Sequence, residues 1–159
     1  MPRKDLEAHK TIKGLGNGDG RLDGNKGASC CSVQYPDWEL YKAKQRRSNF
    51  DYGFLILSTD IILDKKCAFY PSNASGGWLS KMPVRKLSHS WAFEDMFKAE
   101  NSAVRMNHED NQTTDPSAEI HVFGTIEPHY IEQLVIENDR HREVFSGKYS
   151  KFQFLNWPW

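Results

Sequence analysis

The sequence carries no excess charge of either sign and no long hydrophobic run. Its 159 residues include 21 Lys plus Arg and 21 Asp plus Glu, so the formal net charge is zero. This balance argues against a polybasic chain that coats nucleic acid non-specifically, although it leaves room for a local basic groove. The longest apolar runs, such as Phe54–Leu57, are far shorter than the roughly 20 residues that a membrane span needs. We therefore expect no membrane partner.

Cysteine is also scarce. The chain has three cysteines, at Cys30, Cys31 and Cys67. An odd count that includes an adjacent pair does not make a disulfide framework, and no CxxC or HxxxH spacing accompanies it. Segment 17–23 looks like the middle of a calcium-binding loop. The first and twelfth positions of such a loop need oxygen ligands, and here they are Leu15 and Lys26. We expect small buried thiols in a reducing compartment and no metal site. The polar N-terminus lacks a signal-peptide core, which favours a cytoplasmic location.

Hydrophobic patterning predicts short strands alternating with short helices. Residues 1–20 are polar and glycine-rich and are expected to be a flexible segment, followed by one domain over 21–159. The expected strands are 29–35, 52–58 (apolar throughout and so central), 67–70, 119–126 and 135–136. The expected helices are 37–47, 91–100 with Ser90 as its cap, and a short one from Pro128. This irregular order favours an α+β fold over a doubly wound sheet, with long loops at 71–89 and 101–118 that are typical of active sites.

The most informative carboxylate is Glu119. It opens an apolar strand directly after a long polar loop. A carboxylate at the mouth of a strand can stabilise a cationic transition state without being fully buried. An edge-strand glutamate that faces water explains the same pattern, so the residue alone does not decide between the two interpretations.

A basic and aromatic helix is the second candidate feature. Four cations in six residues follow two aromatic residues within 37–47; the set is Trp38, Tyr41, Lys42, Lys44, Arg46 and Arg47. Cations that contact phosphates and rings that stack on bases can together hold a single strand of nucleic acid. A solvated helix face with Trp38 and Tyr41 turned inward accounts for the same residues.

Several segments, in order along the chain, resemble DarT-type DNA ADP-ribosyltransferase toxins. They are 21–24 with 32–42, then 67–75, 115–122 and 126–131. The run Asp115-Pro116-Ser117-Ala118-Glu119 is similar to that family's Asp-Pro-Gln-Ala-Glu strand, and Asn73-Ala74-Ser75 to its Asn-Ala-Ser stretch. Each motif is weak alone, and the ordered set is moderately specific.

The resemblance implies an ADP-ribosyltransferase-like split β-core whose cleft binds NAD. It implies transfer of ADP-ribose from NAD to a base in single-stranded DNA, by the toxin of a toxin–antitoxin pair whose antitoxin is an ADP-ribose hydrolase. Glu119 is then the catalytic glutamate. Asn73 and Ser75, with Lys42 and Arg46, are then the NAD-binding residues. The DNA-binding residues are then Trp38, Tyr41, Lys44 and Arg47.

The sequence departs from the family pattern in two places. The family usually has an N-terminal strand and helix with a His-x-Thr element that grips NAD, and here His9 and Thr11 lie too close to Arg21 for that helix. Glu39 stands where the family often has Lys, and its carboxylate would repel the diphosphate of NAD. We therefore expect an N-terminally shortened relative. Two alternatives stay open: a degenerate relative that only binds nucleic acid, and a transferase of the same fold that acts on protein or RNA.

Overall fold

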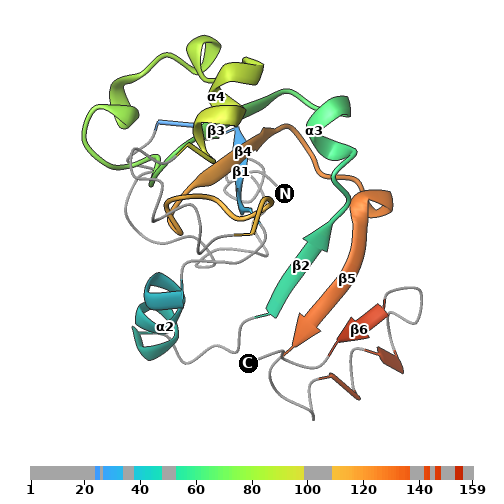
Figure 1. Cartoon of the computed structure of the whole chain (residues 1–159). Coiled ribbons are helices and arrows are strands. Elements are labelled where there is room, and N and C mark those ends of the chain that lie inside the picture. The colour runs from blue at the N-terminus through green and yellow to red at the C-terminus, as the bar shows by residue number, and fades with distance from the viewer. Residues whose placement is uncertain are drawn as a thin grey trace. The chain divides into compact units, whose positions relative to one another are not determined.

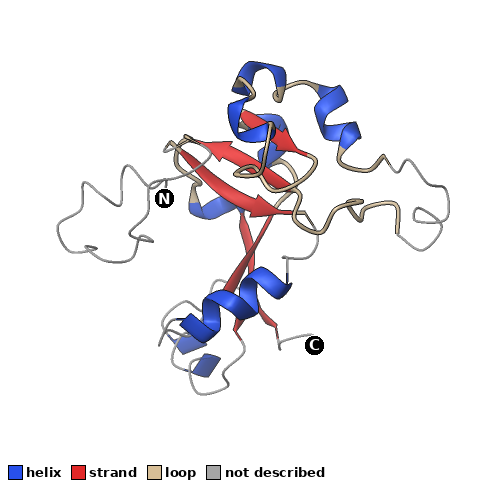
Figure 2. Cartoon of the chain, turned by 90° about the vertical axis from the view of Figure 1, so that its left-hand side faces the viewer, coloured by secondary structure: helices blue, strands red, loops and turns tan. Residues whose placement is uncertain are grey.

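The computed structural model describes residues 24–25, 27–33, 38–47, 53–98, 109–136, 142–143, 146–147 and 153–155 (Figure 1). Helices and small sheets are mixed along the chain, as Figure 2 shows, and the expected α+β class is confirmed. Within this part of the chain, no helix combines the length and apolarity needed to cross a bilayer. The segment 1–20, expected to be flexible, lies outside the described residues.

The elements are short. In chain order they are β1 (Ala28–Ser32), α2 (Trp38–Arg47), β2 (Gly53–Leu57), α3 (Ile61–Asp64), β3 (Cys67–Tyr70), η2 (Leu79–Lys81), η3 (Val84–Lys86), α4 (Ser90–Asp95), β4 (Glu119–Phe123), η4 (Pro128–Tyr130), β5 (Ile131–Ile136) and β6 (Gln153–Leu155). They belong to two compact units, each assembled from two stretches of sequence. Unit 1 combines the described residues of 1–37 and 65–125, and unit 2 those of 38–64 and 126–159.

Unit 1 contains a three-stranded antiparallel sheet with β4 in the middle, in the order β1-β4-β3. In this register Cys30 of β1 lies opposite His121, and Tyr70 of β3 lies opposite Glu119. Successive side chains of a strand point to opposite faces. Glu119 and His121 therefore share one face of the sheet, while Ile120 between them is buried on the other face.

The segment between β3 and β4 supplies much of the core of unit 1. A buried cluster joins β3 to the turns that follow it; its members are Ala68, Tyr70, Ala74, Leu79 and Leu87. The carbonyl of Leu87 also accepts a hydrogen bond of 2.8 Å from the backbone N–H of Phe69. Residues 71–89, expected to be a long loop, therefore include two 3-10 turns, η2 and η3, and are bonded back to β3. On the other side of Phe69, the ring of Phe93 brings α4 against the strand, with 5.3 Å between ring centroids.

Unit 2 contains a second small sheet, in the order β2-β5-β6, with β2 antiparallel and β6 parallel to β5. Helix α2 packs on this sheet through Tyr41, which is buried and lies 5.0 Å from the ring of Phe54. The inward position expected for Tyr41 is thus confirmed. The hydroxyl of Tyr130 donates a 3.0 Å hydrogen bond to Asp64, which ties η4 to the end of α3.

Several expectations for individual elements were wrong, among them those for β2, α4 and β5, and the expected strands 29–35 and 119–126 end earlier, at Ser32 and Phe123. Strand β2 is not central: among the described residues it pairs with β5 alone, and Leu55 and Ile56 are exposed by 56% and 37%. Ser90 is not the cap of α4, because the helix begins at Ser90 itself and His89 stands at the cap position without a side-chain bond. The expected strand over 135–136 begins earlier, at Ile131, directly after η4.

Candidate functional site

The candidate site lies where β1 and β4 run side by side in unit 1. Glu119 and His121 are two residues apart on β4, so the pleat points both to the same face. Cys30 is directly opposite His121 on β1, so its side chain points to that face as well. The backbone register thus brings together a carboxylate, an imidazole and a thiol from positions 91 residues apart in sequence.

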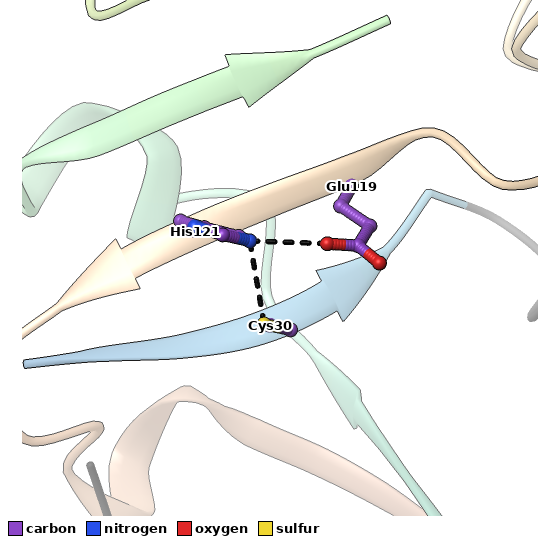
Figure 3. A group of neighbouring side chains, drawn as sticks. All are labelled: Cys30, Glu119 and His121. Carbon is purple, nitrogen blue, oxygen red and sulfur yellow. Dashed lines mark hydrogen bonds and ion pairs between the residues drawn. The ribbon is translucent and has the colours of Figure 1, made fainter. Parts of the chain in front are cut away.

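The three side chains point toward one another (Figure 3). Nε2 of His121 lies 3.0 Å from Oε2 of Glu119 and 3.3 Å from Sγ of Cys30. The side chain of His121 is 0% exposed and that of Glu119 is 20% exposed, whereas Cys30 is an exposed residue. The group therefore extends from the interior of the sheet at His121 to the surface at Cys30.

Asn25 and Tyr70 hold the imidazole from its other side. The amide nitrogen of Asn25 lies 3.1 Å from Nδ1 of His121 and donates a 2.8 Å hydrogen bond to the hydroxyl of Tyr70. The Tyr70 ring also packs on the imidazole, with 4.4 Å between centroids. In this arrangement Nδ1 accepts a hydrogen bond, so the network assigns the ring proton to Nε2, which donates it to Glu119. Both ring nitrogens of this fully buried histidine are thus hydrogen-bonded.

The other two cysteines stand apart from this group. Cys31, the next residue on β1, points to the opposite face of the sheet, where burial raises the pKa of its thiol to about 11. Burial also raises the pKa of Cys67, which is 5% exposed. None of these three cysteines forms a disulfide within the described residues. The expectation of buried thiols is therefore right for Cys67 and wrong for Cys30, whose place on the exposed side of β1 was set by the register of the strand.

Serine and aspartate side chains connect the two loops next to Glu119. The hydroxyl of Ser117 accepts a 3.2 Å hydrogen bond from the backbone N–H of Asn73 and donates a 2.7 Å bond to Asp115. Partial burial acts to raise the pKa of Asp115, but bonds from the hydroxyl and backbone of Ser117 and from Ser72 outweigh it and hold the pKa below the usual value. The loop before β4 is therefore fastened to the loop after β3.

The structure gathers three of the expected site residues in unit 1. Glu119 begins β4, and Asn73 and Ser75 lie in the loop that follows Tyr70, the residue paired with Glu119. Within that loop the side-chain oxygen of Asn73 accepts hydrogen bonds from the backbone N–H and the hydroxyl of Ser75. These two residues thus form a turn near the end of the sheet where Glu119 stands.

The remaining expected residues all come from α2 in unit 2. Lys42 is 3.9 Å from Glu39, an exposed pair one helical turn apart, and Arg46 is exposed. Glu39 is thus partly compensated by a neighbouring cation. Tyr41 is buried against Phe54, so in this structure its ring serves packing. The side chains of Trp38, Lys44 and Arg47 lie outside the described part of the chain, and their nucleic-acid role stays a prediction.

Sequence reasoning missed four residues of the group, namely Asn25, Cys30, Tyr70 and His121. The alternation of polar and apolar residues in 119–122 was a usable signal for His121, because it already places this residue on the face of Glu119. No local pattern indicates that Cys30 and Asn25 meet the same imidazole, since that contact depends on pairing between distant strands.

No protein-family model matches this chain, and a search of curated proteins finds no relative. The site offers a partly exposed carboxylate in a fixed direction, backed by a buried imidazole. It also offers nitrogen, oxygen and sulfur atoms that face one point.

Proposed function

We propose that this chain is a transferase that moves ADP-ribose from NAD to a nucleobase in single-stranded DNA, with Glu119 as the catalytic carboxylate. The observation that carries this proposal is the state of Glu119. Its Oε2 is held by the buried His121, whereas its other oxygen, Oε1, makes no hydrogen bond within the described residues. A carboxylate fixed on one side and accessible on the other suits a charge that develops only in a transition state.

Transfer of ADP-ribose requires a negatively charged group close to the reacting ribose. As the bond between the ribose carbon and nicotinamide breaks, nicotinamide leaves with the electron pair and the sugar acquires oxocarbenium character. The nucleobase nitrogen then bonds to that carbon and releases a proton. Glu119 stabilises the positive sugar electrostatically, and the same carboxylate accepts the proton from the attacking nitrogen. No oxidant or reductant is required.

The neighbouring loops support the same assignment. Asn73 and Ser75 lie in the turn that Ser117 bonds to the loop before β4, next to the start of Glu119's strand. The oxygen of the Asn73 side chain is the acceptor within this turn, so its amide nitrogen is the donor that suits a polar group of a nucleotide. As the family resemblance implies, Lys42 and Arg46 are proposed to contact the phosphates of NAD, and Lys44 and Arg47 the DNA backbone.

The proposal extends to the partner and the compartment. A toxin that modifies DNA needs an enzyme that removes the modification, so the proposed partner is an ADP-ribose hydrolase antitoxin. Both proteins would act where NAD and single-stranded DNA occur together, in the cytoplasm.

The test is transfer of label from NAD labelled in its ADP-ribose portion. The full chain is incubated with mixed single-stranded DNA and, separately, with RNA of the same sequence. We expect label on DNA. Label only on RNA or on protein would mean that the acceptor is not DNA. Binding of DNA without any label would overturn the proposed transferase activity in favour of a nucleic-acid-binding module.

Glu119→Gln is the decisive variant. We expect it to lower transfer by about a hundredfold or more, because the amide lacks the negative charge that stabilises the sugar. Glu94→Gln, an exposed carboxylate on α4, is the matched control and should transfer as the unmodified chain does. Unchanged transfer by a folded Glu119→Gln variant would remove Glu119 from the mechanism.

A further inference from the structure

Cys30, Glu119 and His121 present three different ligating atoms to one point. Sγ of Cys30, a carboxylate oxygen of Glu119 and a ring nitrogen of His121 all lie within 4.8 Å of one another. Nε2 of His121 is 3.0 Å from Oε2 of Glu119 and 3.3 Å from Sγ of Cys30. Figure 3 shows both contacts converging on the same ring nitrogen. A neutral imidazole carries one proton at Nε2 and donates it in one direction, so a single hydrogen bond does not account for both partners at once.

A metal ion accounts for this convergence. Zinc bound to nitrogen, oxygen and sulfur in a tetrahedron separates the N and O ligands by about 3.4 Å and the N and S ligands by about 3.6 Å, given its usual bond lengths. The distances here are a few tenths of an ångström shorter. Small rotations of the Glu119 and Cys30 side chains, which are not fully buried, supply that difference.

The surroundings of His121 also fit a ligand histidine. Such a residue usually donates its second ring N–H to an oxygen that fixes the direction of the ring. Turning the Asn25 amide by half a rotation places its oxygen, in the same position, 3.1 Å from Nδ1. The Tyr70 hydroxyl, 2.8 Å away, then donates to that oxygen where it had accepted before. The Asn25 amide, the Tyr70 hydroxyl and Nδ1 of His121 can thus keep their positions in both the metal-free and the metal-bound state.

We propose that Cys30, Glu119 and His121 bind a zinc-class divalent cation, with a fourth position left toward solvent at Cys30. The mixed donor set selects the class of ion: thiolate and imidazole suit zinc and its neighbours, whereas magnesium and calcium prefer oxygen ligands alone. Three protein ligands with an open position are the arrangement of zinc sites that bind a further molecule. This proposal does not rest on the transferase function, because metal binding is measured without NAD. A dication on Glu119 would neutralise the charge that transfer needs, so the transferase proposal applies to the metal-free chain.

No local pattern of residues indicates this site, because its three ligands do not share a regular spacing along the chain. The usual zinc patterns place two ligands within a few residues and repeat that pair. Here the i, i+2 pair on β4 is completed by a residue on a neighbouring strand, 91 positions earlier. The expectation of no metal site was based on the spacing of residues along the chain. The register between β1 and β4, which that spacing does not show, brings Cys30 next to His121.

The test titrates the reduced, metal-stripped full chain with Zn²⁺ against a chromophoric chelator, and with Co²⁺ as an absorbing substitute. We expect one Zn²⁺ per chain and a thiolate-to-cobalt charge-transfer band. Cys30→Ser should abolish the band and weaken Zn²⁺ binding by at least about tenfold. Removal of a group that only orients a metal ligand already costs about that much, so removal of a ligand should cost no less. Glu119→Gln should weaken Zn²⁺ binding similarly while keeping the band.

Cys31→Ser is the matched control, because this neighbour points to the opposite face of the same strand. It should leave the band and the Zn²⁺ affinity unchanged. Absence of the cobalt band in the unmodified chain would overturn the proposal, and so would equal effects of the two serine variants. Neither result bears on transfer of label from NAD, so the two proposals fail separately.

Discussion

His121 is the residue on which the candidate site depends, although its own side chain is inaccessible to water. Burying a polar ring costs free energy unless its nitrogens find partners, and here Glu119 and Asn25 supply them. The imidazole thereby fixes the direction of a carboxylate that is itself partly exposed. His121 therefore does more than fill the core, because its hydrogen bond holds the partly exposed Glu119 side chain in a fixed position.

Asn25 should act as a positioning residue for any metal that the site binds. We expect Asn25→Ala to weaken Zn²⁺ binding by about 10- to 100-fold, since the ring loses the partner that orients it. Asn25→Asp should restore the affinity, because a carboxylate oxygen accepts the bond from Nδ1 without an amide rotation. Zinc competition titrations measure both variants.

A purely structural role of Asn25 predicts a different pattern. In that case both variants would lower the midpoint of thermal unfolding together, and the aspartate would not recover metal affinity. Asn73→Ala, in the turn after β3, serves as the comparison for removal of an amide elsewhere in unit 1.

Asp115 gives the loop before β4 a measurable pH dependence. Its pKa is lower in the folded chain than the ordinary value of 3.8, so its bonds stabilise the fold above that value and are lost as the pH falls through the lowered pKa. Asp115→Asn should therefore destabilise the chain near neutral pH by about 1 kcal/mol or less, because water screens a partly exposed carboxylate. Chemical denaturation across the acidic range measures this difference.

The difference between Asp115→Asn and the unmodified chain should shrink once the pH is below the lowered pKa. A constant gap between the Asp115 variant and the unmodified chain at every pH would mean that the charge of Asp115 contributes nothing.

How far the site could be predicted differs from residue to residue. Glu119 was found because a carboxylate opening an apolar strand is visible locally. Its partner His121 followed from the same alternation but was not singled out. Cys30 lay in a strand expected to extend to Tyr35, whereas pairing with β4 ends at Ser32. The contact between Cys30 and His121 is fixed only by that register, which a single sequence does not specify.

Among the elements, β3 and α2 were predicted well and β2 was not. Strand 67–70 is buried at every position, and an unbroken apolar run is the pattern expected of a strand that is buried on both faces. The apolar run of β2 looked alike, but Leu55 is more than half exposed. An apolar run reports a preference for burial, but β2 and β3 are both edge strands of their sheets. Strand β3 is buried because the turns that follow it and α4 pack against it, and such packing is not local information.

The pairing of β2 with β5 requires a glycine at one position. A Cβ built on Gly53 would lie 2.9 Å from the carbonyl oxygen of Val135, closer than real Cβ contacts. We expect Gly53→Ala to destabilise unit 2 by about 1–3 kcal/mol, because the obstacle is backbone that moves only with the strand. Thermal unfolding should show the midpoint lowered by several degrees.

Gly147→Ala is the control for Gly53, since none of the described residues has an atom within 4 Å of a Cβ at that position. It should leave the midpoint close to that of the unmodified chain. Equal midpoints for Gly53→Ala and the unmodified chain would show that β2 shifts without cost, which the bulge between Ile56 and Leu57 would then have to absorb.

At the scale of the whole molecule, each unit depends on two distant stretches of sequence. The middle strand of unit 1, β4, lies in the later stretch, but one of its two partners, β1, lies in the earlier one. Long-range pairing of this kind is formed only after a costly closure of the intervening chain. The candidate site shares that dependence, because Cys30 and Asn25 come from the earlier stretch and Glu119 and His121 from the later one.

Residues 65–125 expressed alone should therefore fail to fold, although they are continuous and include β3, α4 and β4. Without β1, β4 loses its hydrogen bonds along one edge and His121 loses both Asn25 and Cys30. A buried histidine that has lost Asn25 and Cys30 adds a desolvation cost of about 1–3 kcal/mol to a sheet reduced to two strands, which is marginal by itself. Amide NMR spectra compare the fragment with the full chain: we expect narrow dispersion for the fragment and wide dispersion for the full chain. A well-dispersed fragment spectrum would show that β3, α4 and β4 form a folded unit without β1, and that the polar group around His121 can be dismantled without loss of the core.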